Sequence, residues 1–323
     1  MPYTPLFDPS AAAQPFQAER AYRLGDRGPA GEADRYEYSP EIELAVNVAL
    51  AAGRPLLVRG RPGTGKSSLA RSVATLLGWR YYAMTVSSRT TARDLLWTFD
   101  SVARLADAQA GSAHIRHRSA YVSPGVLWWA FDPDSARQRG LDRSERSAAE
   151  GRGFSEAVDP SPSGDPDRAV VLIDEIDKAD PDVPNDLLVP LGSFQFAMED
   201  RPPVVARNPP LVIITTNEER DLPKAFLRRC VILALADPSR ERLGKIARRH
   251  FPAAKDAELG PLLDEYERVN DERQARGEPR PSVAELLDAL AACRNLGSPP
   301  GADRWPGLAS LLLDKATEPV EAP

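Results

Sequence analysis

Residues 60–67 restrict the possible folds most, because their sequence Gly-Arg-Pro-Gly-Thr-Gly-Lys-Ser fits the pattern G-x-x-x-x-G-K-[ST]. An apolar run at 55–58 precedes this segment, and residues 67–77 carry apolar side chains at helical spacing. A strand, a glycine-rich turn and a helix in this order predict a loop that binds phosphate groups at the N-terminus of the helix. Glycine leaves backbone N–H groups open to phosphates, and the loop has Gly60, Gly63 and Gly65.

Two side chains of this phosphate loop have separate predicted roles. Lys66 would bridge the β- and γ-phosphates of a nucleotide, and the Ser67 hydroxyl would bind Mg²⁺. We therefore expect ATP and Mg²⁺ as ligands, although the sequence leaves the choice between ATP and GTP open. The predicted nucleotide-binding residues of the loop are Gly60, Pro62, Gly63, Thr64, Gly65, Lys66, Ser67 and Ser68.

The composition limits the partners and the compartment. The 323 residues are 42% hydrophobic and 27% charged, as in ordinary globular proteins. The net charge of −6 and the pI of about 5.4 give no overall attraction to nucleic acid, which is not an expected partner. No apolar run reaches membrane-spanning length, and residues 1–4 lack the layout of a signal peptide. We expect a cytoplasmic protein with no membrane partner.

Five apolar runs predict the strands of an α/β core. Residues 169–173 are aliphatic without polar alternation, which is typical of a parallel strand covered on both faces. The five predicted strands are 55–58, 80–86, 169–173, 210–217 and 230–235, with a hairpin beginning at 194–199.

Changes in pattern divide the chain into segments. Residues 1–35 form a predicted extended arm, which Tyr3, Phe7, Phe16 and Tyr22 could anchor. Residues 36–236 form the predicted core, and its polar insertion at about 132–168 is expected to be poorly ordered because it has little apolar surface to bury. Residues 237–323 form a predicted helical domain, with helices at 238–251, 259–274, 282–293 and 305–315.

Asp174 and Glu175 are the second element of the predicted phosphate site. They follow the buried strand 169–173, at the sheet edge where the phosphate loop also leaves its own strand. We assign Asp174 to Mg²⁺ and Glu175 to the water that attacks the γ-phosphate. Acidic residues after a strand can also be plain helix caps, but a complete phosphate loop upstream favours the catalytic interpretation.

The phosphate loop, residues 170–179 and residues 213–217 together resemble the AAA+ ATPase superfamily, and within it the MoxR-like group. The resemblance covers the chain from about Ser39 to at least Leu290. It implies a three-layer α/β core with a five-stranded parallel sheet, followed by a small all-α lid domain.

Further site residues are implied by the resemblance. Asn217 matches the polar residue that helps to orient the hydrolytic water, and Arg280 matches the lid arginine that senses the nucleotide. Arg229, or Arg228 beside it, matches the arginine that reaches the γ-phosphate bound by the neighbouring subunit. From the residues alone, the arginines could instead be helix-terminal or surface cations, and Asn217 a turn former.

The implied function is a Mg²⁺-dependent ATPase that acts as a ring, expected to be a hexamer, and remodels a protein partner. The resemblance suggests a von Willebrand A-type protein as that partner. A nucleotide-controlled oligomerising switch with slow turnover remains an alternative, because it would carry the same motifs. Two departures from the group concern the substrate-contacting region: Trp97 replaces a usual glycine, and the insertion is long.

Overall fold

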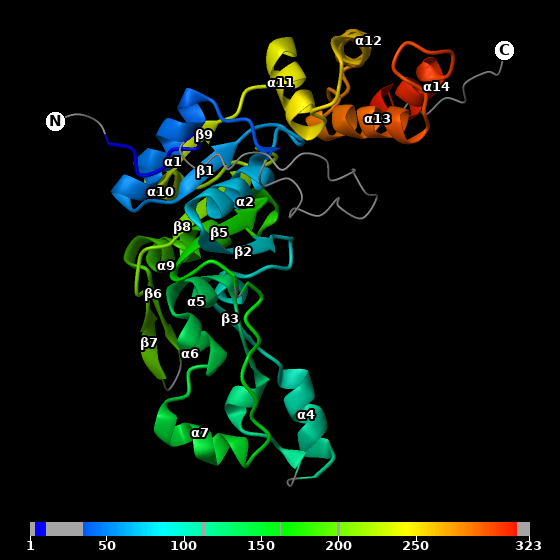
Figure 1. The fold of residues 1–323 in the computed structure, drawn as a ribbon. Helices are drawn as coiled ribbons and strands as arrows, with labels where there is room; N and C mark the ends of the chain where they lie inside the picture. Colours follow the sequence, from blue (N-terminus) through cyan, green and yellow to red (C-terminus); the bar gives the residue numbers. More distant parts are fainter. Residues whose placement is uncertain (1–3, 11–34, 112–113, 162, 199–200, 315–323) are drawn as a thin grey trace. The chain divides into compact units, whose positions relative to one another are not determined.

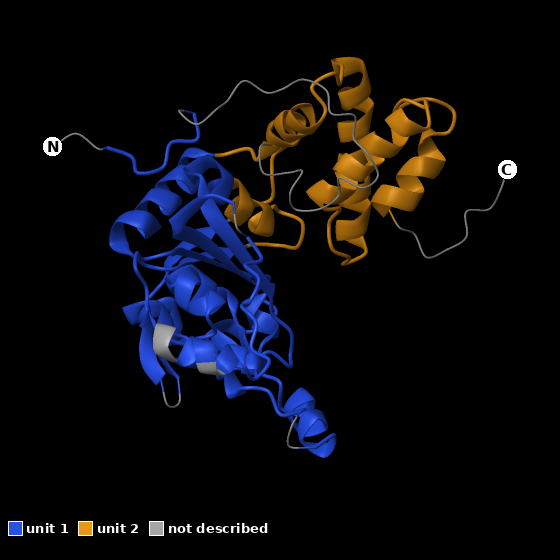
Figure 2. Cartoon of the chain, turned by 60° about the horizontal axis from the view of Figure 1, so that its bottom comes forward, with its two compact units in different colours: residues 1–13, 39–59, 73–234 blue, residues 14–38, 60–72, 235–323 orange. Residues whose placement is uncertain are grey.

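A computed structural model describes residues 4–10, 35–111, 114–161, 163–198 and 201–314 of the chain (Figure 1). The chain forms two compact units (Figure 2). The first unit comprises residues 1–13, 39–59 and 73–234, and the second comprises residues 14–38, 60–72 and 235–323. The phosphate loop therefore belongs to the same unit as the C-terminal helices.

A parallel sheet of five strands lies at the centre of the first unit and confirms the predicted α/β fold. Its strand order is β2-β5-β8-β1-β9, and each neighbouring pair is parallel. The strands are β1 (Leu56–Arg59), β2 (Trp79–Thr85), β5 (Asp165–Asp174), β8 (Leu211–Thr216) and β9 (Val231–Ala234). All six residues of β8 are buried, as expected of a strand with helices on both faces.

Helices and two further antiparallel strand pairs accompany this sheet. α1 packs against β1 and β9, and α5 packs against β2 and β5 (Figure 1). The helices are α1 (Pro40–Ala52), α2 (Lys66–Leu77), α3 (Ala92–Leu96), α4 (Ser101–Gln109), α5 (Val126–Phe131), α8 (Val183–Asp186), α9 (Leu188–Ser193) and α10 (Lys224–Leu227). Two antiparallel pairs lie outside the sheet: β3 (Trp97–Phe99) with β4 (Val122–Pro124), and the predicted hairpin of β6 (Gln195–Met198) with β7 (Arg201–Val205).

The expectation of a poorly ordered insertion at about 132–168 is wrong. This segment contains α6 (Pro133–Arg137), α7 (Arg143–Glu150) and the first part of β5. Leu141, Ala149 and Phe154 form a small buried cluster of its own. The Asp132 carboxylate caps α6 by accepting a hydrogen bond from the Ser135 N–H at 3.1 Å. The segment therefore forms ordered structure with few apolar residues, because hydrogen bonds of polar side chains add to the small buried cluster.

A buried ion pair ties the end of this insertion to the sheet. Arg80 of β2 donates from Nη1 to Asp159 Oδ2 at 2.8 Å, and their side chains are only 10% and 4% exposed. The Tyr82 hydroxyl donates to Asp159 Oδ1 at 3.2 Å. Burial raises the pKa of Tyr82 to about 12, so the phenol keeps its proton.

Replacing Asp159 by alanine is expected to destabilise the protein by about 3–5 kcal/mol, because it leaves the Arg80 guanidinium buried without its carboxylate. Urea denaturation measures the change in unfolding free energy. Asp134→Ala is the matched control: Asp134 pairs with Arg207 at 2.7 Å, but its side chain is 62% exposed. Asp134→Ala should lower the unfolding free energy by less than about 1 kcal/mol. Equal decreases in unfolding free energy in the two variants would contradict the explanation that burial makes the Arg80–Asp159 pair the more important one.

The predicted arm at 1–35 lies largely outside the described residues, including Tyr3, Phe16 and Tyr22. Phe7 is described and is 3% exposed. Its backbone N–H donates to Asn47 Oδ1 of α1 at 2.8 Å, and its carbonyl accepts from Asn47 Nδ2 at 2.8 Å. This aromatic therefore anchors its segment to the first unit.

The predicted helices of the second unit are present. They are α11 (Arg240–His250), α12 (Asp256–Ala275), α13 (Val283–Asn295) and α14 (Trp305–Ala309), followed by the π-helical turn η5 (Ser310–Asp314). Leu243, Leu262, Leu286 and Leu290 are among the residues of their shared core. Ser282 and Glu285 form the capping box of α13. Within the described part of the chain, no helix is both long enough and apolar enough to cross a membrane.

Candidate nucleotide-binding and hydrolysis site

The phosphate loop follows β1 directly in the chain and runs into α2. Gly63 and Gly65 have φ angles of +79° and +88°, a region that favours glycine. A Cβ on Gly63 would lie 2.2 Å from the Cβ of Ser282, which caps α13. Glycine is therefore required at this position by backbone conformation and by the close approach of Ser282.

The side chain of Lys66 contacts the backbone of the phosphate loop. Its Nζ donates to the carbonyl oxygens of Gly60 at 2.7 Å and Arg61 at 2.8 Å, and the residue is 6% exposed. These two acceptors are neutral, and a charge-assisted hydrogen bond to a phosphate is stronger than one to a carbonyl oxygen. Ser67 is exposed and Ser68 is half-buried at the start of α2.

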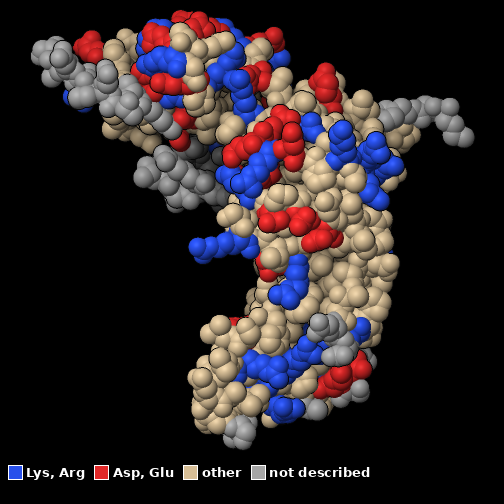
Figure 3. Space-filling model, turned by 180° about the vertical axis from the view of Figure 1, so that it is seen from behind, with Lys and Arg blue, Asp and Glu red and all other residues tan. Residues whose placement is uncertain are grey.

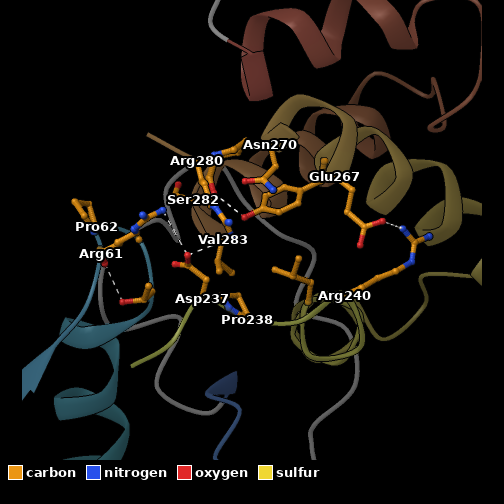
Figure 4. Close-up of a pocket in the computed structure, with 15 residues that line it drawn as sticks. Arg61, Pro62, Asp237, Pro238, Arg240, Glu267, Asn270, Arg280, Ser282 and Val283 are labelled. Atoms are coloured by element: carbon orange, nitrogen blue, oxygen red, sulfur yellow. Dashed lines mark hydrogen bonds and ion pairs between the residues drawn. The ribbon is translucent and has the colours of Figure 1, made fainter. Parts of the chain in front are cut away.

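A cavity of about 170 Å³ lies beside the loop within the second unit (Figure 4). Residues 61–64 line one part of it, and the rest is lined by residues within 237–243, by three residues of α12 and by residues 280–283. Arg280, which the sequence predicted for nucleotide sensing, lies at this cavity together with the loop. Figure 4 shows Arg61 and Arg280 reaching the same carboxylate, that of Asp237.

Asp174, Glu175 and Asn217 come together in the first unit, at the carboxyl ends of β5 and β8. The Asn217 amide donates from Nδ2 to Glu175 Oε1 at 3.3 Å. Asp174 Oδ1 accepts a hydrogen bond from the Thr215 hydroxyl at 2.5 Å. β8 lies between β5 and β1, so these groups share the sheet edge from which β1 continues into the phosphate loop.

The backbone of Glu175 is strained. Its φ of 60° and ψ of 48° place it in the left-handed region, which is uncommon for residues other than glycine. The Glu175 N–H donates to Thr215 Oγ1 at 2.9 Å and helps to hold this conformation. Such strain concentrates at functional positions, where the surrounding structure maintains it.

Three residues that support this cluster were missed in the sequence analysis: Thr215, Asp177 and Lys178. Thr215 contacts both acidic residues, as described above. Asp177 is 3% exposed, and its Oδ2 accepts from the Asn217 N–H at 3.1 Å. Lys178 Nζ pairs with Glu175 Oε2 at 2.9 Å, and this carboxylate raises the pKa of the lysine. All three lie in the segments that carried the family resemblance, so their positions could have been noted.

Arg228 and Arg229 lie between α10 and β9, and both are exposed. Arg229 Nη1 donates to the Ala225 carbonyl oxygen of α10 at 3.3 Å. Their role toward a neighbouring subunit remains a prediction.

These features define the class of protein. A glycine-rich loop between a strand of a parallel sheet and a helix, with an acidic pair ending the strand two places away, is the arrangement of phosphate-loop nucleotidases. The sequence profile of the AAA domain (dynein-related subfamily) matches residues 55–230, more than half of the 323-residue chain. The chain belongs to this family, and it is an ATPase that binds nucleotide.

Solved structures with a similar fold have low sequence identity to the chain. A proposed ATPase from Cytophaga hutchinsonii has a TM-score of 0.41 and 15% identity; the match covers 71% of this chain and 58% of that protein. The RuvB Holliday junction branch migration motor of Thermotoga maritima has a TM-score of 0.44 and 16% identity over 84% of this chain and 67% of that one. Domain III of Thermotoga maritima DnaA, a replication initiation protein, has a TM-score of 0.42 and 15% identity over 89% and 97%. A comparison with curated proteins finds no match.

Proposed function

We propose that this chain is a Mg²⁺-dependent ATPase of the MoxR-like group, working as a homohexameric ring that remodels or activates a protein partner. The observation that carries the proposal is the cluster of Asp174, Glu175 and Asn217 at the sheet edge from which the phosphate loop starts. A hydrolytic site needs a group that activates water close to the terminal phosphate, and this cluster supplies it.

The chain's own residues divide the work of the reaction. The loop N–H groups and Lys66 bind the phosphates, Glu175 accepts the proton of the attacking water, and Asn217 orients Glu175 through the 3.3 Å hydrogen bond. Ser67 carries a hydroxyl and Asp174 a carboxylate, and oxygen ligands of these kinds are the ones that Mg²⁺ prefers. When bound, Mg²⁺ neutralises phosphate charge.

The hydrolytic site is completed, in this proposal, by a second copy of the chain. Arg228 and Arg229 are exposed at the start of β9, which is an edge strand of the sheet. From this edge a guanidinium group can reach the phosphates of a neighbouring subunit and stabilise the charge of the transition state. AAA proteins generally assemble into rings, and such an arginine explains why hydrolysis would need the assembly.

Replacing both Arg228 and Arg229 by alanine is expected to lower the ATPase rate about 10³-fold, because the transition state loses its cationic partner. ATP affinity should stay near that of the unmodified protein, since the phosphate loop is untouched. A coupled assay of ADP release measures the rate, and calorimetry measures the affinity.

Arg220→Ala is the matched control, since Arg220 is an exposed arginine that follows β8 in the same unit. The rate should also depend on protein concentration, because the hydrolytic site forms only on assembly. If dilute monomer hydrolyses ATP as fast as the assembled form, the shared-site proposal is wrong. Native mass spectrometry with ATP and Mg²⁺ gives the number of subunits.

A protein partner fits the surface better than nucleic acid does. On the upper part of the face shown in Figure 3, cationic and anionic side chains of the described residues lie next to each other, whereas a stretch of cationic side chains crosses its lower part. The chain as a whole carries a net charge of −6. A nucleic-acid backbone is bound by continuous cationic surface. We propose a von Willebrand A-type protein as the partner. Co-purification of the two proteins with and without ATP tests this proposal. Equal binding of the partner in both conditions would contradict remodelling driven by ATP.

A further inference from the structure

One carboxylate in the second unit is shared by two arginines of the cavity. Asp237 Oδ2 lies 3.5 Å from Arg61 Nη1 of the phosphate loop and 3.4 Å from Arg280 Nη1 (Figure 4). Asp237 follows β9 and precedes α11, so it belongs to neither of the motifs that predicted the site. This carboxylate joins the loop to the arginine predicted to sense nucleotide.

The carboxylates around the cavity are unevenly distributed among its arginines. Arg240, a third arginine of the lining, has two carboxylates of its own, Asp264 and Glu267, each at 2.5 Å. Arg61 and Arg280 have only Asp237 as a carboxylate partner within the described cavity lining. The positive excess is therefore local to Arg61 and Arg280, because Arg240 with its two carboxylates carries an equal negative excess. An anionic group that reaches Arg61 and Arg280 meets this local excess.

The contacts of Asp237 are also loose. Strong ion pairs between arginine and carboxylate have N···O distances of about 2.7–2.9 Å. The contacts of Asp237 are longer, and its side chain is 35% exposed to water, which weakens them further. A phosphate group carries more charge and more acceptor oxygens than one carboxylate, so it can displace Asp237 from these arginines.

We propose that Asp237 is a counter-ion that competes with the terminal phosphate of the nucleotide for Arg280 and Arg61, and so sets the affinity for ATP relative to ADP. This inference rests on the proposed function. The carboxylate offsets part of the positive charge of the two arginines when no triphosphate is bound. Binding of ATP transfers Arg280 to the third phosphate group, which ADP lacks. Asp237 thus acts through the arginines and is a positioning residue.

Calorimetric titration of the full chain with ATP and with ADP, each with Mg²⁺, tests the proposal. Asp237→Asn removes the competing charge and keeps the shape of the side chain. It should bind ATP about three- to tenfold tighter, as expected for the loss of a half-exposed ion pair, and ADP within about twofold of the original affinity. Asp264→Asn is the matched control, because Asp264 pairs with Arg240 instead, and it should change neither affinity.

Two further measurements separate this role from a structural one. In an Arg280→Gln background, Asp237→Asn should no longer tighten ATP binding, because the arginine for which Asp237 and the phosphate compete is absent. Without nucleotide the Asp237→Asn protein should melt at a slightly lower temperature, and ATP should raise that temperature more than in the original protein. Asp237→Ser, made in parallel, should show the same gain in ATP affinity.

Unchanged or weaker ATP binding in both Asp237 variants would overturn the inference, and so would a gain that persists with Arg280→Gln. The original protein serves as the reference for the proposed function itself. If it fails to bind ATP, the proposed function is wrong; if it binds ATP normally while the Asp237 variants show no gain, only this inference is wrong.

Discussion

Lys66→Ala is expected to abolish ATP binding, with an affinity loss of about 100-fold or more, since it removes the charged donor of the phosphate loop. This ammonium donates to the carbonyl oxygens of Gly60 and Arg61 at 2.7 and 2.8 Å. These contacts place the ammonium at the loop. Calorimetry with ATP and Mg²⁺ measures the loss, and the ATPase rate should fall to background.

Lys245→Ala is the control for this variant, because Lys245 is an exposed lysine of α11 that pairs with Glu241 at 2.7 Å. It should bind and hydrolyse ATP normally. Thermal melts of both variants test whether the loop still folds when its buried lysine is lost. Normal ATPase activity in folded Lys66→Ala protein would refute the assignment of the phosphate loop.

Glu175→Gln is expected to keep ATP binding and to lower hydrolysis about 10²–10⁴-fold, the usual contribution of a general base. Glutamine keeps the shape of the side chain and can still contact Asn217, but it cannot accept a proton from water. The ion pair with Lys178 at 2.9 Å is also lost, so thermal stability is measured alongside single-turnover hydrolysis.

Glu219→Gln is the matched control, since Glu219 is an exposed acid just beyond β8 in the same unit. The Glu175 variant also separates two kinds of function. A remodelling motor should lose its effect on the partner while it still binds ATP, whereas a nucleotide-controlled switch should keep or enhance its signal. Unchanged hydrolysis in the Glu175 variant would mean that another group activates the water.

The sheet could be predicted from the sequence because parallel strands buried on both faces are continuous apolar runs. Residues 169–173 and 211–214 are such runs; the first lies in the C-terminal part of β5, and the second makes up most of β8. The phosphate loop could also be predicted from the sequence, because its chemistry requires specific residue types at fixed spacing. Local patterns of this kind carry their own structural information.

Contacts between distant residues could not be predicted in this way. The insertion is held by Arg80 and Asp159, which are 79 positions apart, and neither stands out in its own segment. Asp237 lies next to Arg61 only because the chain folds back on the phosphate loop within one unit. Asp177 looks like one more acid after a strand, and only its buried contact with Asn217 reveals its role. Such pairings depend on the tertiary fold, which no local pattern specifies.

The division of the hydrolytic site between two copies of the chain is tested most directly by mixing two inactive variants. Lys66→Ala subunits lack the phosphate loop function but keep Arg228 and Arg229, and the double arginine variant has the opposite defect. We predict that the mixture hydrolyses ATP although neither variant does so alone, because some interfaces then join an intact loop to an intact arginine. A mixture that remains inactive, while native mass spectrometry shows both variants in one assembly, would contradict the shared site.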